Sequence, residues 1–465
     1  MRLLRAFAAL LVLSLLVLLL ATPARAEEGE WQLTFSAISK LLDNNDNFSR
    51  DGRFLVYDTR DTVATGIGGS LAIMKVSITT GLENFVYAPT PVMYGTGGSA
   101  PGVAAVSFSP LADETIFIHG PLVSEVPALG FYGTTNRRGG RATGDGAGDI
   151  RFLDCRDVTS ATTKPGAHRG GSHRHEYSAD GKRIGFTYDD HLVTQNARTI
   201  GVLIPHAKAP CGVSHWAALL VAVVPTASAK TGDITRAADD SWAGANGLMR
   251  AFIGQVKQPD GATMSSLFVA DIPADIDITT SDSGTLTTPM TPPKGVTIRR
   301  LTNTTAAGIV RGSLDGTRIG YFATPAGGSR QVFLINSKGS DQDPNPEMRP
   351  VQATTLEKGA SGGLRWHPSG NSIAVISDNG IAAVCVKAGP LFGKAHWLTQ
   401  HGTSVVAADA LVWSRDGTRL AFNRRVPTYD SAGKLVKDAG GNDFRQIFLV
   451  NFPDANRNGI ADPIE

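Results

Sequence analysis

The chain repeats one short pattern roughly every fifty residues, a period typical of repeat folds. A small residue is followed by a turn built on Asp-Gly or Ser-Gly and then by a run of β-branched and aromatic residues. The pattern occurs in NFSRDGRFLVYDTR (47–60), VSFSPLADETIFI (106–118), HEYSADGKRIGFT (175–187), VRGSLDGTRIGYF (310–322), LRWHPSGNSIAVI (364–376) and LVWSRDGTRLAF (411–422). It predicts units that each bury an apolar face against the next.

Each unit predicts one antiparallel sheet. The alternating run after the turn predicts a second strand, because apolar and polar residues that alternate suit a half-buried strand. A third strand is expected in SLAIMKVS (70–77), SLFVADI (266–272), RQVFLIN (330–336) and RQIFLVN (445–451). A recurrent Leu-Thr, in IRRLT (298–302) and HWLT (396–399), predicts a fourth. Four-stranded units repeated around an axis form a β-propeller, so we predict an all-β propeller.

The number of blades follows from the spacing of the turns. Six turns are recognisable, and the interval between Gly181 and Gly316 leaves room for one degenerate blade. We assign this blade to HWAALLVAVV (215–224), AFIGQV (251–256), the turn Pro259-Asp260-Gly261 and SLFVADI. The sequence therefore predicts about seven blades, with six as the alternative.

The two ends of the chain predict how the ring closes. The last unit has no Leu-Thr strand after RQIFLVN (445–451), whereas WQLT (31–34) supplies such a strand near the start. We expect the N-terminal strand to complete the final blade, because closure removes the open sheet edges that an incomplete ring would expose.

The first 26 residues predict a signal peptide. Arg2 and Arg5 precede an apolar run, and Ala24-Arg25-Ala26 supplies small residues at a cleavage site. We expect a signal peptide over 1–26, a propeller over 27–452 and a short tail over 453–465. The mature protein is expected to be periplasmic or secreted, with no membrane span after signal cleavage.

Three cysteines allow at most one intramolecular disulfide, which an oxidising compartment permits. Cys385 lies in an apolar run that predicts a buried strand, so any bridge is expected between Cys155 and Cys211.

The charges exclude one class of partner. The chain has 44 Lys and Arg against 42 Asp and Glu, whereas a general nucleic-acid surface needs a strong excess of positive charge.

The turn and strand patterns resemble the repeats of TolB-like (WD40-like, PD40) propellers. FIHGP (117–121), RGGSHRHEYSADGKRIGFTYDDH (169–191), SHW (214–216) and the stretch from WHPSG to DNGIA (366–382) are similar to the bacterial YidR-like family of such propellers. The resemblance implies the fold and no established activity.

Propeller geometry predicts a binding rim. The first strand of a blade lines the central channel, and the loops that leave strands two and four lie on one face. Most of the ten histidines fall on these loops. The predicted rim comprises His119, His168, Arg169, His173, His175, Asp189, Asp190, His191, His215 and Trp216. Alternatively, the histidines form hydrogen bonds that hold the loops, and Trp216 packs in the core.

His173 and His175 lie two apart in a predicted strand, so their side chains are expected on one side. With a third histidine from another blade they would form a site for a divalent transition metal. Oligogalacturonate lyases are also propellers with a histidine-bound metal, and this broader resemblance suggests a lyase or hydrolase acting on acidic oligosaccharides. There the metal would neutralise a uronate carboxylate, with Arg169 or Arg198 clamping the acid.

The C-terminal residues DANRNGIADPIE (454–465) match the spacing of a calcium loop. Oxygen ligands occupy loop positions 1, 3, 5, 9 and 12, and Gly459 occupies the turn position. The candidate ligands are Asp454, Asn456, Asn458, Asp462 and Glu465. A polar tail that frays at the chain end is the alternative.

Two classes of function remain. The first is an exported binding propeller that captures a protein segment or a glycan at the channel rim. The second is the metal-dependent lyase or hydrolase. We favour binding, because no complete set of nucleophile, base and orienting group can be assembled from the sequence.

Overall fold

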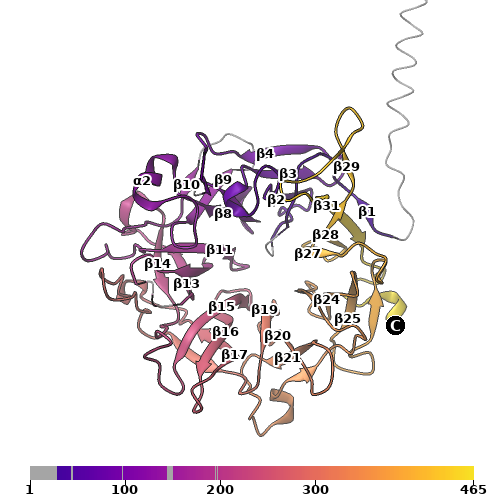
Figure 1. Ribbon diagram of the computed structural model, residues 1–465. Helices are drawn as coiled ribbons and strands as arrows, with labels where there is room; N and C mark the ends of the chain where they lie inside the picture. The colour runs from indigo at the N-terminus through magenta and orange to yellow at the C-terminus, as the bar shows by residue number, and fades with distance from the viewer. Residues whose placement is uncertain (1–28, 43–45, 97, 144–149, 194, 196) are drawn as a thin grey trace, which may run out of the picture.

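The computed structural model describes residues 29–465 apart from 43–45, 97, 144–149, 194 and 196. The described chain forms a closed ring of seven blades around a central channel (Figure 1). Within each blade the first strand lies nearest the axis, and the following strands lie progressively farther out. The prediction of an all-β, seven-bladed propeller is confirmed. No helix among the described residues is long and apolar enough to span a membrane. The predicted signal peptide, 1–26, lies outside the described residues.

Within the described residues six blades are four-stranded, and the first has three strands plus isolated bridges at Leu41 and Phe48 where its innermost strand would lie. In chain order the blades are β2 (Phe54–Asp58), β3 (Ile73–Ser77), β4 (Glu83–Tyr87); β7 (Val103–Phe108), β8 (Glu114–His119), β9 (Arg138–Thr143), β10 (Arg151–Phe152); β11 (Gly171–Tyr177), β12 (Ile184–Asp189), β13 (Thr199–Pro205), β14 (His215–Leu219); β15 (Ile234–Ala243), β16 (Met249–Lys257), β17 (Thr263–Asp271), β18 (Thr297–Arg300); β19 (Ala307–Gly312), β20 (Arg318–Ala323), β21 (Gln331–Asn336), β22 (Val351–Gln352); β23 (Gly362–Trp366), β24 (Ser372–Ser377), β25 (Gly380–Cys385), β26 (Ala395–Trp397); and β27 (Asp409–Trp413), β28 (Arg419–Val426), β31 (Phe444–Asn451), β1 (Trp31–Gln32).

Short elements decorate the ring. They are the hairpins β5 (Met93–Gly95) with β6 (Gly98–Ala100) and β29 (Thr428–Tyr429) with β30 (Leu435–Val436), the helix α2 (Val126–Leu129), and the 3₁₀ turns η1 (Ile67–Gly69), η2 (Val123–Glu125), η3 (Pro210–Gly212), η4 (Ile278–Thr280), η5 (Pro346–Met348) and η6 (Asp462–Ile464).

Six of the inner strands carry the same irregularity. In each, the pairing register shifts at a β-bulge, and one residue at or beside the bulge has a positive φ: Ala105, Arg174, Asp239, Gly308, Gly363 and Ala410. A bulge bends the strand and adds an unpaired residue. It therefore breaks the simple alternation of faces that a regular strand would have.

The ring closes as the sequence predicts. β1 pairs antiparallel with β31, with Trp31 opposite Leu449 and Gln32 opposite Phe448. The pairing continues beyond the strand, because the Leu33 amide donates to the carbonyl oxygen of Ile447 at 2.8 Å. The N-terminal strand thus supplies the outermost position of the last blade.

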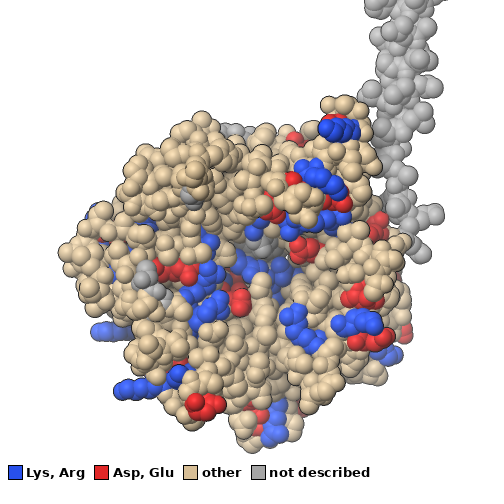
Figure 2. Space-filling view, viewed as in Figure 1, with Lys and Arg blue, Asp and Glu red and all other residues tan. Residues whose placement is uncertain are grey.

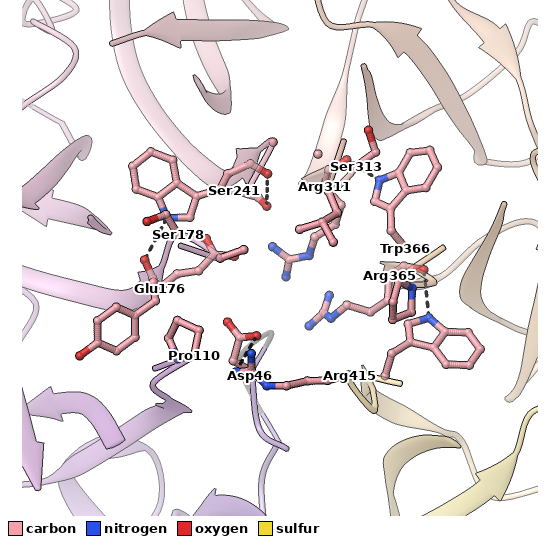
Figure 3. A pocket seen from close by; sticks show the side chains of 18 of the residues that line it. Asp46, Pro110, Glu176, Ser178, Ser241, Arg311, Ser313, Arg365, Trp366 and Arg415 are labelled. Carbon is pink, nitrogen blue, oxygen red and sulfur yellow. Dashed lines mark hydrogen bonds and ion pairs between the residues drawn. The ribbon is translucent and has the colours of Figure 1, made fainter. Parts of the chain in front are cut away.

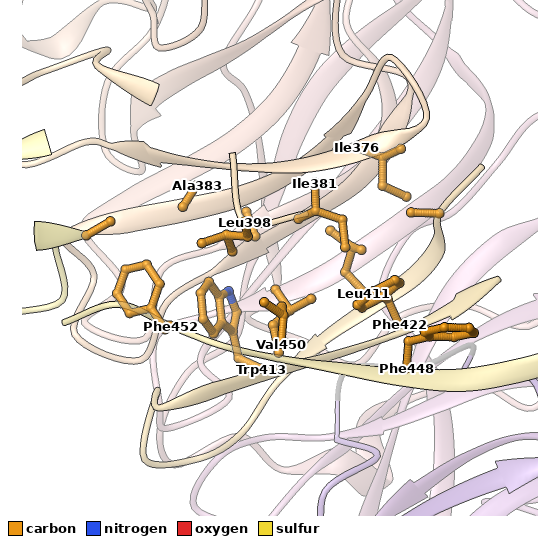
Figure 4. Close-up of a cluster of buried hydrophobic side chains, with 14 of the residues drawn as sticks. Ile376, Ile381, Ala383, Leu398, Leu411, Trp413, Phe422, Phe448, Val450 and Phe452 are labelled. Atoms are coloured by element: carbon orange, nitrogen blue, oxygen red, sulfur yellow. The ribbon is translucent and has the colours of Figure 1, made fainter. Parts of the chain in front are cut away.

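The core lies between neighbouring blades. Figure 4 shows one such cluster, in which Ile381 and Leu398 of the sixth blade pack against Leu411, Trp413 and Phe422 of the seventh. Indole groups add a polar link between blades. The N–H groups of Trp242, Trp366 and Trp413 donate to backbone carbonyls of an inner strand one blade earlier, at Glu176, Arg311 and Arg365.

The prediction for the degenerate fourth blade was wrong in one part. HWAALL (215–220) contains β14, the outer strand of the third blade, and the inner strand of the fourth blade is β15. A continuous apolar run predicts burial, and β14 is buried along its whole length although it is an outer strand. AFIGQV (251–256) and SLFVADI (266–272) do belong to the fourth blade, where Pro259-Asp260-Gly261 joins β16 to β17.

The structure joins Cys155 and Cys211 in a disulfide and leaves Cys385 buried as a free thiol. The C-terminal tail packs against the ring. Ile460 and Ile464 are buried in the cluster between the sixth and seventh blades.

Candidate functional site

The predicted rim residues lie mostly inside the third blade and its contacts with the second. Seven of them are buried: His119, His168, Arg169, His175, Asp190, His215 and Trp216. His173, Asp189 and His191 are partly exposed. Their role as a binding rim stays a prediction.

His168 and His175 meet at one buried carboxylate. Nε2 of His168 lies 3.1 Å from Oδ2 of Asp154. The Ser172 hydroxyl donates to the same oxygen at 2.8 Å and lies 3.1 Å from Nε2 of His175. Burial raises the pKa of Asp154, but the charge of His168 outweighs it, so the pKa falls below its usual range. Burial lowers the pKa of His175 to about 4. The network links the blades and is closed to solvent.

The other predicted histidines are also hydrogen-bonded within the blades. His119 contacts the Tyr87 hydroxyl at 3.0 Å, and burial lowers its pKa to about 4. Nδ1 of His173 lies 3.0 Å from the Thr187 hydroxyl. The bulge at Arg174 separates His173 from His175, so the two rings make different contacts.

The paired acids of the rim are bound to arginines. Asp190 accepts a hydrogen bond from Nη2 of Arg169 at 2.7 Å, and Nη2 of Arg198 lies 2.8 Å from Oδ2 of Asp189. Both guanidinium groups suggested as acid clamps are therefore already engaged. Trp216 donates to the Ser281 hydroxyl and packs against Gly166, which matches the core alternative.

Over the described part of the chain, no group of three His, Cys, Asp or Glu side chains is arranged to hold a metal ion. The transition-metal site at His173 and His175 stays a prediction.

A cavity of about 310 Å³ lies on the propeller axis, on the face that carries the turns between first and second strands. Every blade contributes to it, through Asp46, Pro110, Glu176, Ser241, Arg311, Arg365 and Arg415 in blade order. We call it the axial cavity. None of the ten predicted rim residues lines it. Figure 2 shows arginine and lysine side chains gathered around the central hollow.

The axial cavity is rich in arginine. The guanidinium groups of Arg311 and Arg365 point into it side by side, facing Asp46 and Glu176 (Figure 3). Nη2 of Arg415 lies 3.8 Å from Oδ1 of Asp46. Burial raises the pKa of Asp46 to about 6 against the opposing charge of Arg415.

Glu176 is held by a neighbouring buried cation. Nη1 of Arg250 lies 2.6 Å from its Oε2, while Nη2 of Arg250 lies 2.6 Å from Oδ2 of Asp240. Burial alone raises the pKa of Glu176, but the charges of Arg250 and Arg311 outweigh it and leave the pKa lowered.

Arg311 has few partners. Its side chain is buried, and within the described residues Nε and Nη2 have no hydrogen-bond acceptor. Its Nη1 donates to the carbonyl oxygen of the preceding residue, Val310, at 3.4 Å. Burial and the guanidinium of Arg365 hold the pKa of Arg311 well below its usual range.

A second cavity, of about 380 Å³, lies at the opposite end of the channel. Arg174, Arg330 and Asp409 line it, and Arg365 lines both cavities. This end belongs to the face on which the rim was predicted. Most of the lining comes from the fifth, sixth and seventh blades, with Leu41 and Leu42 from the first and Arg174 from the third, and none of the predicted rim residues lines the cavity.

Sequence reasoning missed the arginines of the axial cavity, although a signal was present. Glu176, Arg311 and Arg365 each stand two residues before the residue that begins the turn, and the strands of Arg311 and Arg365 are otherwise apolar. Three of the six aligned repeats therefore place a charge in the same column, which a regular buried strand does not favour.

The C-terminal loop brings several predicted calcium ligands together. The Glu465 carboxylate accepts hydrogen bonds from the side-chain amides of Asn456 and Asn458, and Asp454 accepts from the amides of Asn458 and Gly459. Asp462 accepts from the Ala455 amide. Gly459 has φ near 78° and lies against Ser369, so only glycine fits this turn.

The family model for a protein of unknown function, DUF3748, matches residues 102–216. The uncharacterized protein YidR of Escherichia coli K12 is 32% identical over 420 residues, which cover 84% of this chain and 94% of that protein. The chain belongs to the YidR family. The prediction of a YidR-like propeller is thereby confirmed.

Two solved structures resemble this YidR-family propeller. Oligogalacturonate lyase in complex with manganese has a TM-score of 0.50 at 11% identity, covering 92% of this chain and 99% of its own. TolB from Acinetobacter baumannii has a TM-score of 0.36 at 12% identity, covering 86% of this chain and 80% of its own. The likeness to the lyase concerns the fold alone.

Proposed function

We propose that this protein is an exported binding propeller that captures a protein segment or a glycan in the axial cavity. The observation that carries the proposal is the cavity itself, because all seven blades supply residues to one concave site of about 310 Å³. Concave sites with a few convergent polar groups on an otherwise apolar wall are the usual places for ligands.

Export is supported by two features. The leader over 1–26 has the composition of a signal peptide, and the disulfide between Cys155 and Cys211 suits an oxidising compartment. We further propose that the C-terminal loop binds calcium, since Asp454, Asn456, Asn458, Asp462 and Glu465 lie at the spacing of a calcium loop on a tail that is packed in place.

The lyase alternative has less support. Each histidine suggested as a metal ligand is hydrogen-bonded inside the blades, and the described residues supply no three-residue metal cluster. Metal analysis of the purified protein, with and without His173→Ala, checks this alternative independently.

A saccharide array and a random peptide display library, screened against the mature protein, test the binding proposal. Each ligand found is measured again on Leu314→Glu, which alters a half-exposed residue of the cavity wall, and on Leu286→Glu, which alters a similarly exposed residue elsewhere. We expect binding to be lost in the first variant and kept in the second.

Ligands lost instead in His191→Ala would move the site to the predicted rim. Screens that give no ligand, or ligands insensitive to Leu314→Glu, would count against capture in the axial cavity.

A further inference from the structure

We propose that Arg311 and Arg365 form a carboxylate-binding site in the axial cavity, and that the carboxylate belongs to a protein segment in which it adjoins an apolar group. The inference rests on the proposed function for its location and adds the chemical class of the ligand.

Among the described residues, the buried guanidinium group of Arg311 lacks hydrogen-bond acceptors for two of its nitrogen atoms. A buried guanidinium costs several kcal/mol of desolvation unless charges or hydrogen bonds offset it. The described residues offer Nε and Nη2 no acceptor, although both are buried. The group points into the cavity beside Arg365 (Figure 3). Guanidinium groups bind carboxylates through paired N–H donors, so an anion there supplies the missing acceptor.

The charges of the cavity favour an anion. Arg311, Arg365 and Arg415 face the carboxylates of Asp46 and Glu176, while the adjacent Arg250 is matched by Asp240. This leaves one net positive charge when Asp46 is ionised and two when Asp46 is protonated. A single bound carboxylate therefore does not give the buried cavity a net negative charge in either state.

The remaining wall favours a peptide over a saccharide. The hydroxyls of Ser178, Ser313 and Ser414 are hydrogen-bonded to Asp180, Asp315 and Asp416 of their own turns. The indole N–H groups of the three lining tryptophans are bonded to backbone carbonyls. Apart from the charged side chains, few polar groups are left for sugar hydroxyls, whereas Pro110, Leu314 and the indole rings offer apolar contact.

Asp46 makes the site sensitive to pH. It faces Arg415, Glu176, Arg365 and Arg311, and burial raises its pKa to about 6. An ionised Asp46 repels a bound carboxylate, so the anion binds together with a proton on Asp46. The affinity therefore rises as the pH falls through 6, by up to about tenfold between pH 7 and pH 5. An α-carboxyl with a pKa of about 3.5 stays ionised over this range.

The test uses N-acetylphenylalanine, which joins a carboxylate to an aromatic group, and its neutral amide as the matched ligand. Calorimetric titration at pH 5.5 is run on the mature protein, on Arg311→Met and on Arg330→Met. Arg330 is the control, because it lines the opposite cavity and donates to the backbone carbonyl of Ala360. Inorganic phosphate and trigalacturonate are titrated in parallel.

We expect the acid to bind about 10-fold or more tightly than the amide, because hydrogen bonds between charged groups are lost with the amide. Arg311→Met should lose this preference and Arg330→Met should keep it. Melting without ligand supplies a second readout. Arg311→Met removes a buried cation that has two N–H groups without acceptors among the described residues, so its melting midpoint should be unchanged or raised. Such a midpoint would exclude misfolding as the cause of the lost preference for the acid. Asp46→Asn should abolish the pH dependence.

Equal affinity for acid and amide, an unchanged affinity in Arg311→Met, or no binding of the acid would overturn the proposal. If trigalacturonate binds in a way that depends on Arg311 and N-acetylphenylalanine does not bind comparably, the ligand of the site is a saccharide and not a protein segment. That last result would leave the proposed function standing, whereas ligands that bind away from the cavity would reject both.

Discussion

Leu33→Ala tests whether the N-terminal segment holds the ring closed. Leu33 follows β1 and is 7% exposed, in the cluster that joins the seventh blade to the first through Leu42, Phe48 and Leu449. Truncating a buried leucine to alanine costs about 2–5 kcal/mol through lost burial and the cavity left behind. Thr34→Val is a second perturbation, because its hydroxyl donates to Gln446 and accepts from the Ile447 amide. Two unpaired buried groups cost about 2–4 kcal/mol.

The assay is thermal unfolding followed by circular dichroism. With an unfolding entropy of about 2.1 cal/mol/K per residue over roughly 430 residues, 1 kcal/mol shifts the midpoint by about 1 °C. We expect Leu33→Ala to melt about 2–5 °C lower and Thr34→Val about 2–4 °C lower.

Phe35→Ala is the matched control. Phe35 lies in the same segment and is 67% exposed, so its loss should change stability by at most about 0.5 kcal/mol. Leu33→Ala and Phe35→Ala melting at the same temperature would refute the role of this segment in closure.

Three further predictions concern the indole hydrogen bonds, the disulfide and the C-terminal loop. Trp366→Phe removes the 2.8 Å bond to the Arg311 carbonyl and should lower the melting midpoint by about 1–2 °C, more than Trp413→Phe, whose bond measures 3.4 Å; equal shifts would argue against the bond. Reduction of the disulfide, which spans 56 residues, should cost about 4 kcal/mol. The midpoint of the wild type should then fall with reductant while that of Cys211→Ser does not respond, and a wild type insensitive to reductant would contradict this. Calorimetric titration of calcium should give a Kd of about 10⁻⁴–10⁻³ M that is lost in Asp454→Ala, and identical flat traces for both proteins would reject the loop.

Much of the fold could be predicted because its signals are local. An Asp-Gly turn followed by alternating residues specifies two strands without knowledge of the rest, and the Leu-Thr strands identified the outer positions, including the one filled from the N-terminus. The fourth blade was harder, because HWAALL is a buried outer strand and its apolar run resembles an inner one.

The cavity could not be predicted in the same way. A positive φ at Arg174, Gly308 and Gly363 interrupts the alternation, so counting residues in twos does not show which side chains face the channel. The grouping of Arg311, Arg365 and Asp46 also needs the ring, since they come from three blades. The sequence showed which histidines could bind a metal, but it did not show that most of them are buried. His175 and His119 lie inside hydrogen-bond networks that only packing reveals.

The most direct test of ligand capture on the propeller axis is a crystal of the mature protein grown with N-acetyl-4-bromophenylalanine at pH 5.5. Anomalous diffraction from bromine locates the ligand without assumptions about its contacts. We predict one peak inside the axial cavity, with the carboxylate between Arg311 and Arg365. A peak beside His173 or His191, or at the opposite end of the channel, would contradict the account.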